Sequence, residues 1–193
     1  MAILFFDTET SDLPDYKSGP GPHQPHVVQL AAVLAEGAAG DGPERVLSTL
    51  VKPEGWTIDP GAQEKHGISA ERAAAEGIAI AQAIEQFDAL LAKADLVVAH
   101  NVKFDRLLMD SEYVRLARQG AWPETFCTMQ ACTNILRLHG RYGFKWPRLD
   151  EAYRHFFSAD NPGAHDALSD VRACQAIFHE LLRRGLARQT GQP

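Results

Sequence analysis

Short apolar runs separated by polar turns fill the first quarter of the chain, a pattern typical of a β-sheet. The run AILFFD, residues 2–7, is continuously apolar, as in a strand buried on both faces. Two further runs, 27–35 and 45–53, flank a Gly-rich turn. Short connections favour antiparallel pairing, so these runs predict an antiparallel meander. The segment 11–26, SDLPDYKSGPGPHQPH, is rich in Pro and Gly and predicts an irregular loop.

In the middle of the chain the apolar positions take on helical spacing. Over 80–94 they share one helical stripe, at Ile80, Ile84, Phe87 and Leu91. The apolar run 96–101 predicts a return to the sheet. A second helix is expected over 103–120, with Asn101 capping its start and Gly120 ending it.

The C-terminal part continues the alternation. We expect a short strand around 125–129, then a helical region, and then the segment 141–157. The last helix is predicted over about 166–184, with a buried stripe at Leu168, Val171, Cys174, Phe178 and Leu181. Strands first, then alternating helices and strands, predict an α/β fold with a mixed sheet flanked by helices. We expect one domain over 1–185 and a short tail over 186–193.

Composition limits the class of protein. With 193 residues, 45% hydrophobic and 23% charged, the chain fits one soluble globular domain. No segment approaches the roughly 20 apolar residues of a membrane helix, and the N-terminus does not resemble a secretion signal. A net charge of −6 argues against a broad basic face that coats nucleic acid, but not against local contacts with a short strand. The odd number of cysteines, 3, favours free thiols and a cytoplasmic protein.

The first strand ends in two carboxylates, Asp7 and Glu9. Side chains two apart on a strand share a face, so the two acids would project together and repel each other. A divalent cation would neutralise both, and oxygen ligands favour Mg²⁺ or Mn²⁺, which points to phosphate chemistry. The alternative is a solvated turn after the strand, because an isolated D-x-E is common.

Two more segments place acids beside predicted helix starts. In AHNVKFD, Asp105 follows a buried strand, and in AHDALSD, Asp170 lies five residues after His165. Each has a simpler interpretation, since the helix dipole alone favours acids at helix N-termini and the histidine could be an ordinary loop residue. Their joint occurrence with FDTET favours a shared site.

In this order, FDTET, AHNVKFD and AHDALSD resemble the exonuclease motifs of the DEDDh family, which includes the proofreading subunit of bacterial DNA polymerase III and ribonuclease T. EKHGIS and KWPRLDEAYRHFF also resemble connecting segments of that family, so the resemblance covers nearly the whole chain. It implies a ribonuclease H-like five-stranded sheet. It also implies stepwise hydrolysis from the 3′ end of single-stranded nucleic acid, with DNA favoured over RNA and release of nucleoside 5′-monophosphates.

The resemblance assigns roles by motif position. It implies that Asp7, Glu9, Asp105 and Asp170 hold two Mg²⁺ ions, with Mn²⁺ as a substitute. His165 is the implied general base, and its H-x-A-x-x-D spacing separates this branch from relatives that use Tyr. Its loop setting suggests that it swings in when substrate arrives. Thr10 and His66 are candidates for contact with the terminal nucleotide, with a turn role as the alternative for His66.

Other residues near the motifs receive less specific assignments. Four further acids are expected to be surface groups or caps: Asp12, Asp15, Asp110 and Asp166. Trp56 and Trp146 could stack on a base, but core packing is favoured. Cys127 stands where related sequences often carry an acid.

A locally basic stretch could meet a phosphate backbone or could be a solvated face; it comprises Arg137, Arg141, Lys145 and Arg148.

Three functions fit these observations. The first is a stand-alone exonuclease acting on DNA or RNA. The second is the same chemistry in a proofreading subunit; a polymerase partner is compatible with the sequence but is not indicated by it. The third is a catalytically silent nucleic-acid binding module, which the intact set of acids argues against. No membrane partner is expected, and the oligomeric state is left open.

Overall fold

The computed structural model describes residues 1–37 and 42–187, so most of the predicted tail 186–193 lies outside the described residues. The strands are β1 (Ala2–Thr10), β2 (Val27–Glu36), β3 (Glu44–Leu50), β4 (Leu96–Ala99), β5 (Glu124–Cys127), β6 (His139–Gly140) and β7 (Gly143–Phe144). The helices are α1 (Pro60–His66), α2 (Ala70–Glu76), α3 (Ile80–Leu91), α4 (Val102–Arg115), α5 (Thr128–Leu136), α6 (Leu149–Phe157) and α7 (Ala167–Arg183).

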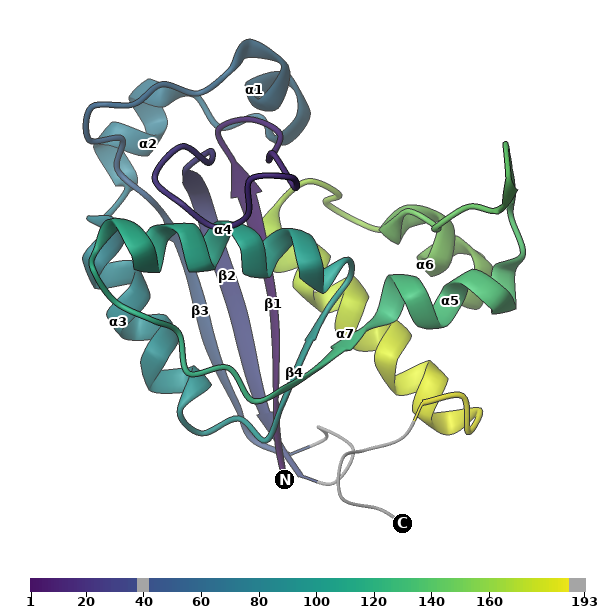
Figure 1. Cartoon of the computed structure of the whole chain (residues 1–193). Coiled ribbons are helices and arrows are strands. Elements are labelled where there is room, and N and C mark those ends of the chain that lie inside the picture. Colours follow the sequence, from purple (N-terminus) through teal and green to yellow (C-terminus); the bar gives the residue numbers. More distant parts are fainter. Residues whose placement is uncertain (38–41, 188–193) are drawn as a thin grey trace.

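The main sheet has five strands in the order β3-β2-β1-β4-β5 (Figure 1). β1 pairs antiparallel with β2, and β2 antiparallel with β3, which confirms the predicted meander. β4 pairs parallel with β1, and β5 parallel with β4, so the sheet is mixed as predicted. Because β1 and β4 run in the same direction, their carboxyl ends meet at one end of the sheet.

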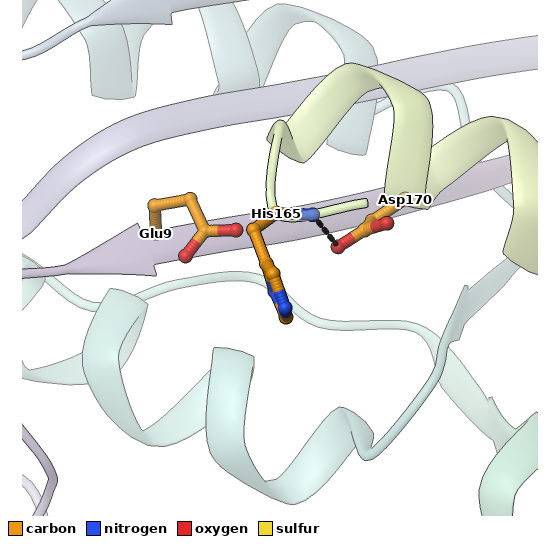
Figure 2. A group of neighbouring side chains, drawn as sticks. All are labelled: Glu9, His165 and Asp170. Atoms are coloured by element: carbon orange, nitrogen blue, oxygen red, sulfur yellow. Dashed lines mark hydrogen bonds between the residues drawn. The ribbon is translucent and has the colours of Figure 1, made fainter. Parts of the chain in front are cut away.

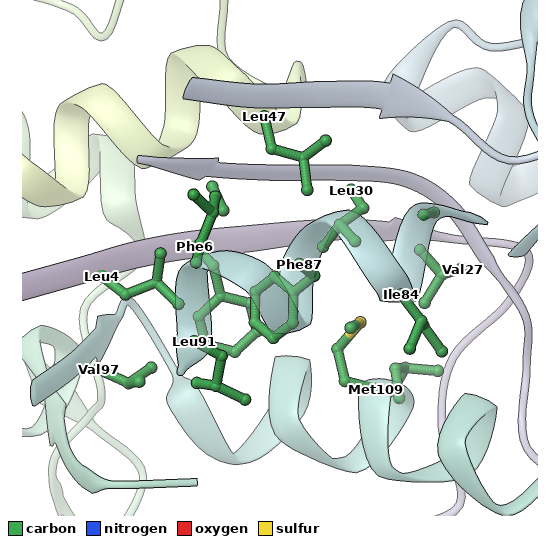
Figure 3. Close-up of a cluster of buried hydrophobic side chains, with 14 of the residues drawn as sticks. Leu4, Phe6, Val27, Leu30, Leu47, Ile84, Phe87, Leu91, Val97 and Met109 are labelled. Atoms are coloured by element: carbon green, nitrogen blue, oxygen red, sulfur yellow. The ribbon is translucent and has the colours of Figure 1, made fainter. Parts of the chain in front are cut away.

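The central strand β1 is buried on both faces and divides the core into two layers. Leu4 and Phe6 face one layer, packed with Phe87 of α3 and Met109 of α4 (Figure 3). Ile3 and Phe5 face the other layer, where the ring of Phe5 meets Phe178 of α7 edge-on at 5.6 Å between centroids. This alternation decides that odd-numbered side chains of β1 point toward α7 and even-numbered ones toward α4.

Helix α4 departs from the sequence prediction at both ends. It ends at Arg115 rather than at Gly120. A side chain at Gly120 would come within 2.6 Å of the Tyr113 ring, so this glycine allows the chain to fold back against α4 rather than continue it. At the start, Asn101 adopts a left-handed backbone (φ 83°) and its side chain makes no capping hydrogen bond. Asn101 therefore occupies the predicted N-cap position, but its side chain does not cap the helix.

Three short elements were not predicted, because each is too brief to show a periodic apolar stripe. Helices α1 and α2 are each 7 residues long, and the side chains of Asp59 and Ser69 cap their first turns. The β6–β7 hairpin has two residues in each strand and lies within the segment 137–148, between α5 and α6.

Two further predictions concern the tryptophans, expected in the core, and the cysteines, expected as free thiols. Trp56 packs against two apolar clusters and stacks on His26 at 4.8 Å, which confirms core packing. Trp146 is 64% exposed, so core packing was wrong for that residue; it follows the short hairpin and has no apolar layer above it. All three cysteines are free thiols. Within 1–37 and 42–187, none of the helices has the length and apolar character needed to span a bilayer.

Candidate active site

The carboxyl end of β1 carries the first two predicted ligands. Asp7 and Glu9 share the face of Phe5, so both carboxylates point toward α7. Glu9 is buried and Asp7 is half-buried. Burial of an ionised carboxylate costs free energy unless a hydrogen-bond donor or a cation compensates its charge.

Asp170 lies in the first turn of α7 and is also buried. Its Oδ1 accepts a hydrogen bond from Asn161 Nδ2 at 2.7 Å, and its Oδ2 accepts one from the backbone N–H of His165 at 3.2 Å. The two donors fix the orientation of the carboxylate, and the helix N-terminus favours its negative charge.

Three side chains converge between β1 and α7 (Figure 2). Glu9, His165 and Asp170 each offer a ligand atom, and these atoms lie within 4.8 Å of one another. His165 is exposed and has a left-handed backbone (φ 71°), which turns the chain sharply just before α7. The structure thus brings Glu9 to His165 and Asp170, which follow it by 156 and 161 positions, and the group could hold a metal ion.

Asp105 approaches the end of β1 from the opposite side. It lies in the first turn of α4 and is 2% exposed. Its Oδ1 accepts hydrogen bonds from the backbone N–H of Thr8 (3.0 Å) and from Thr8 Oγ1 (2.9 Å). Thr8 is an even-numbered residue of β1, so its side chain faces α4 while the neighbouring acids face α7.

The pKa values show how strongly these four acids resist ionisation together. Burial, followed by the charges of Asp105 and Glu9, raises the pKa of Asp7 well above its usual range. Burial raises the pKa of Glu9 to about 8 and that of Asp105 to about 7. Burial also raises the pKa of Asp170. A cluster of buried oxygen ligands that repel one another fits a divalent cation, which would make the ionised forms favourable.

Lys65 of α1 supplies a positive charge to the cluster. It lowers the pKa of both Asp7 and Glu9, against the effect of burial. Lys65 lies within the segment EKHGIS, but the sequence alone predicted no role for it; its position directly before His66 was the available signal.

Gln29 connects the two sides of the site. It is the register partner of Glu9 on β2. Its Nε2 donates to Asp166 Oδ2 at 2.9 Å, and its Oε1 accepts from the backbone N–H of Ala167 at 3.1 Å. Asp166 is the N-cap of α7, as expected for a cap, and its side chain accepts from Ser169 N. Gln29 therefore ties the start of α7 to the strand beside Glu9.

Thr10 and His66, the predicted contacts for the terminal nucleotide, lie next to each other. The His66 ring lies against the Thr10 backbone, and its Nδ1 accepts a hydrogen bond from Ile68 N at 3.0 Å. Burial lowers the pKa of His66, so the ring is neutral at neutral pH. Thr10 Oγ1 donates to the carbonyl oxygen of Asp12 at 2.9 Å. The hydroxyl of Thr10 is thus engaged within its own loop.

The loop 11–26 is irregular, as predicted, and is fastened to α4. Ser111 Oγ accepts a hydrogen bond from Gly21 N at 3.2 Å. Glu112 Oε1 accepts from Val27 N at 3.0 Å and lies 2.7 Å from Arg115 Nη1. At the other end of the loop, the Tyr16 side chain hydrogen-bonds to Asn101, directly before the helix that carries Asp105. These contacts hold the loop beside the carboxyl ends of β1 and β4.

The locally basic stretch is less basic than the sequence indicated. Lys145 Nζ lies 2.6 Å from Glu151 Oε1, and Arg148 Nε lies 3.0 Å from Asp150 Oδ1. Their charges are largely neutralised by the first turn of α6. Arg137 and Arg141 make no ion pair with any described residue; Arg137 instead donates to the carbonyl oxygen of Asn134.

Sequence reasoning missed Gln29, Thr8 and Asn161. Each acts by holding an acid or a helix start rather than by carrying the chemistry itself. Thr8 lies between two motif acids, and its alternation with them was the only signal in the sequence. Asn161 and Gln29 have no spacing relation to the motifs, so their roles depend on the tertiary contacts.

Comparison with protein families decides the class of the protein. The family model described as RNase T exonuclease matches residues 4–178. The chain belongs to this exonuclease family. The match confirms the resemblance to the DEDDh exonucleases, and it spans all three motif segments. A comparison with curated protein sequences found no match.

Solved structures of E. coli exonuclease I share the fold. The complex with a dT13 oligonucleotide matches with a TM-score of 0.76 and 21% identity, covering 95% of this chain and 41% of that chain. The complex with a dA16 oligonucleotide gives 0.74 and 21%, covering 95% and 41%. A zinc-bound form of its complex with single-stranded DNA gives 0.72 and 23%, covering 95% and 40%. The chain spans less than half the length of these proteins, and the likeness confirms the ribonuclease H-like sheet.

Proposed function

We propose that the protein is a metal-dependent 3′-5′ exonuclease that removes nucleoside 5′-monophosphates from single-stranded nucleic acid, with DNA favoured over RNA. The observation that carries the proposal is the convergence of Glu9, His165 and Asp170 beside Asp7 at the end of β1. The structural likeness to exonuclease I in complex with single-stranded oligonucleotides supports the choice of substrate. The three free thiols are in keeping with a cytoplasmic protein.

The acids would hold the metal, for which we propose Mg²⁺. Asp7, Glu9 and Asp170 would hold one ion, and Asp105 together with Asp7 would hold a second. Bound in pairs, such ions stabilise the attacking and leaving oxygens of an in-line phosphoryl displacement. The chain's own contribution is orientation: Asn161 and the His165 backbone hold Asp170, and Thr8 holds Asp105.

His165 is the proposed general base. Its imidazole is exposed and reaches the same space as the carboxylate oxygens of Glu9 and Asp170. A neutral imidazole accepts the proton of an attacking water near neutral pH. We propose that Thr10, the last residue of β1, and His66, which lies beside it, contact the terminal nucleotide.

The test is digestion of single-stranded DNA and RNA oligonucleotides of one sequence, labelled at the 5′ end. With Mg²⁺ we expect a ladder of shortened products that keep the label, and no cleavage in EDTA. Glu9→Gln should abolish the ladder, whereas Glu85→Gln, which changes an exposed acid of α3, should cleave as the wild type. Immediate release of a labelled mononucleotide would contradict the polarity, and faster digestion of RNA would reverse the sugar preference. Intact oligonucleotides with either Mg²⁺ or Mn²⁺ would favour the binding module.

A further inference from the structure

Three exposed aromatic rings gather on one short segment outside the candidate active site. We call residues 137–148, which include β6, β7 and the turn between them, the aromatic hairpin. Tyr142 is 90% exposed, Trp146 64% and Phe144 45%. Soluble proteins rarely present several large aromatic side chains in one exposed segment unless the surface binds something.

The aromatic hairpin carries four Lys and Arg side chains, and two of them are not paired with an acid among the described residues. Lys145 and Arg148 pair with acids of α6, which fixes the base of the hairpin to that helix. Arg137 and Arg141 make no ion pair with any described residue, and the Arg141 guanidinium lies over the Tyr142 ring at 5.3 Å. The turn of the hairpin therefore presents a cation and an aromatic face side by side, and Arg137 adds a second cation at its base.

A half-buried histidine, His100, joins the aromatic hairpin to the edge of the candidate active site. His100 follows β4 directly, and its Nε2–H donates to the carbonyl oxygen of Pro147 at 3.0 Å. Its Nδ1 lies 2.9 Å from Thr128 Oγ1 at the start of α5. The next residue, Asn101, opens the helix that carries Asp105. In Figure 1 the segment between α5 and α6 projects toward the end of the molecule at which the β1 arrow points.

We propose that the aromatic hairpin binds the substrate strand upstream of its 3′ end, with bases stacked on Tyr142 and Trp146 and phosphates near Arg137 and Arg141. The inference rests on the proposed function for the location of the 3′ end. Single-stranded nucleic acid is the occupant because it offers a partner for both kinds of side chain on the hairpin. Each base has a π-face for the aromatic rings, and a phosphate charge for the arginines lies between successive bases. A second copy of this chain, with its net charge of −6, is the competing occupant.

The test compares two double variants with a matched control. Y142A/W146A removes the two most exposed rings, and R137A/R141A removes the two arginines that make no ion pair with a described residue. R45A/V46A removes an exposed cation and an exposed apolar side chain from β3, the opposite edge of the sheet from β5. None of these side chains belongs to the buried core, so all three proteins should fold; thermal unfolding checks this.

Binding is measured in EDTA, by fluorescence anisotropy of single-stranded DNA and RNA oligonucleotides of about 15 nucleotides, a length that spans a typical single-strand site. Removal of the rings should weaken binding roughly tenfold for each base that loses its stacking partner. Removal of the arginines should also reduce the slope of affinity against salt, by about one for each phosphate that is no longer neutralised. The control should bind as the wild type.

Cleavage of an oligonucleotide of about three nucleotides, shorter than a typical single-strand site, separates the two proposals. Unchanged kcat/KM on the short substrate with weakened binding of the long one supports the surface. Wild-type binding of the long strand by both variants overturns it, and so does a variant that changes only the oligomeric state in size-exclusion chromatography. A wild-type protein that cleaves neither substrate, while Y142A/W146A still weakens binding, refutes the proposed function and leaves the surface standing.

Discussion

Gln29 and Glu9 face each other across the β1–β2 ladder, and the Gln29 amide holds the first residues of α7. The Gln29 side chain thus links β2, the strand paired with the one that carries Glu9, to the helix that carries Asp170. The position of Asp170 relative to Glu9 therefore depends on this link. Gln29 is a positioning residue, because it reaches the chemistry only through Asp166 and Ala167.

Gln29→Ala should therefore reduce cleavage more than stability. Outer residues that orient metal ligands typically contribute 10- to 100-fold, and we expect a loss of kcat of about that size. The matched control is Gln175→Ala, because Gln175 is also buried and its Nε2 ties α7 to Glu44 Oε1 of β3, at 2.8 Å. Both variants should lose about 1–2 kcal/mol of unfolding free energy. Equal kcat values for the two variants would show that Gln29 has only a structural role.

Asp7→Asn should stabilise the metal-free protein while it strongly lowers activity. The substitution removes one of several carboxylates that raise one another's pKa in a buried cluster. Relief of about 1 kcal/mol would raise Tm by roughly 2–4 °C in EDTA. Loss of a ligand should lower cleavage by about 10²–10⁴-fold, and Mg²⁺ should raise Tm less than in the wild type.

The control for this measurement is Asp160→Asn, which changes a carboxylate at the surface that pairs with Arg154. Exposed ion pairs contribute little, so its Tm should change by less than a degree or two, about 0.5 kcal/mol or less. A fall in the metal-free Tm of Asp7→Asn would mean that the aspartate is held by favourable contacts rather than strained by its neighbours.

The sequence predicted the sheet and the acids of the site for the same reason. Apolar runs such as 27–35 report burial directly, and Asp7 and Glu9 depend only on the alternation of one strand. Contacts between distant segments cannot be inferred from the pattern of apolar and polar residues. Nothing in the spacing of Asn161 or Gln29 reveals that they hold Asp170 and the start of α7. The exposure of Trp146 was missed because an aromatic residue in an apolar segment indicates core packing unless the hairpin itself is known.

Substitution of His165 distinguishes between two possible roles of its imidazole, a general base and a metal ligand. His165→Ala should reduce cleavage by about 10²–10⁴-fold, the usual contribution of a general base. The backbone N–H that bonds to Asp170 remains, so the rise of Tm with Mg²⁺ should be kept. His165→Gly should lose as much activity but unfold at a higher temperature than His165→Ala, because glycine adopts φ 71° without strain. His155→Ala, at an exposed histidine of α6, is the control. Loss of the Mg²⁺ effect in His165→Ala would make the imidazole a metal ligand instead.

Glu112 lies away from the candidate active site, and its ionisation should make the stability of the fold depend on pH. Burial acts to raise the pKa of Glu112, but hydrogen bonds from His26 and Val27 and the charge of Arg115 outweigh it and hold the pKa below 4.5. A depressed pKa in the folded state stabilises the protein above the unfolded value, and this stability is lost as the pH falls through the folded value. Glu112→Gln should therefore cost about 3 kcal/mol at neutral pH, and the difference from the wild type should shrink below about pH 4.5.

Urea unfolding at a series of pH values measures this difference, with Glu85→Gln as the exposed control. The control should lie within about 0.5 kcal/mol of the wild type at every pH. Because Glu112 also accepts from Val27 N, where the loop 11–26 meets β2, its loss should expose that loop to limited proteolysis before the core unfolds. A difference that stays constant down to the lowest pH would show that Glu112 stabilises the fold by packing and not by its charge.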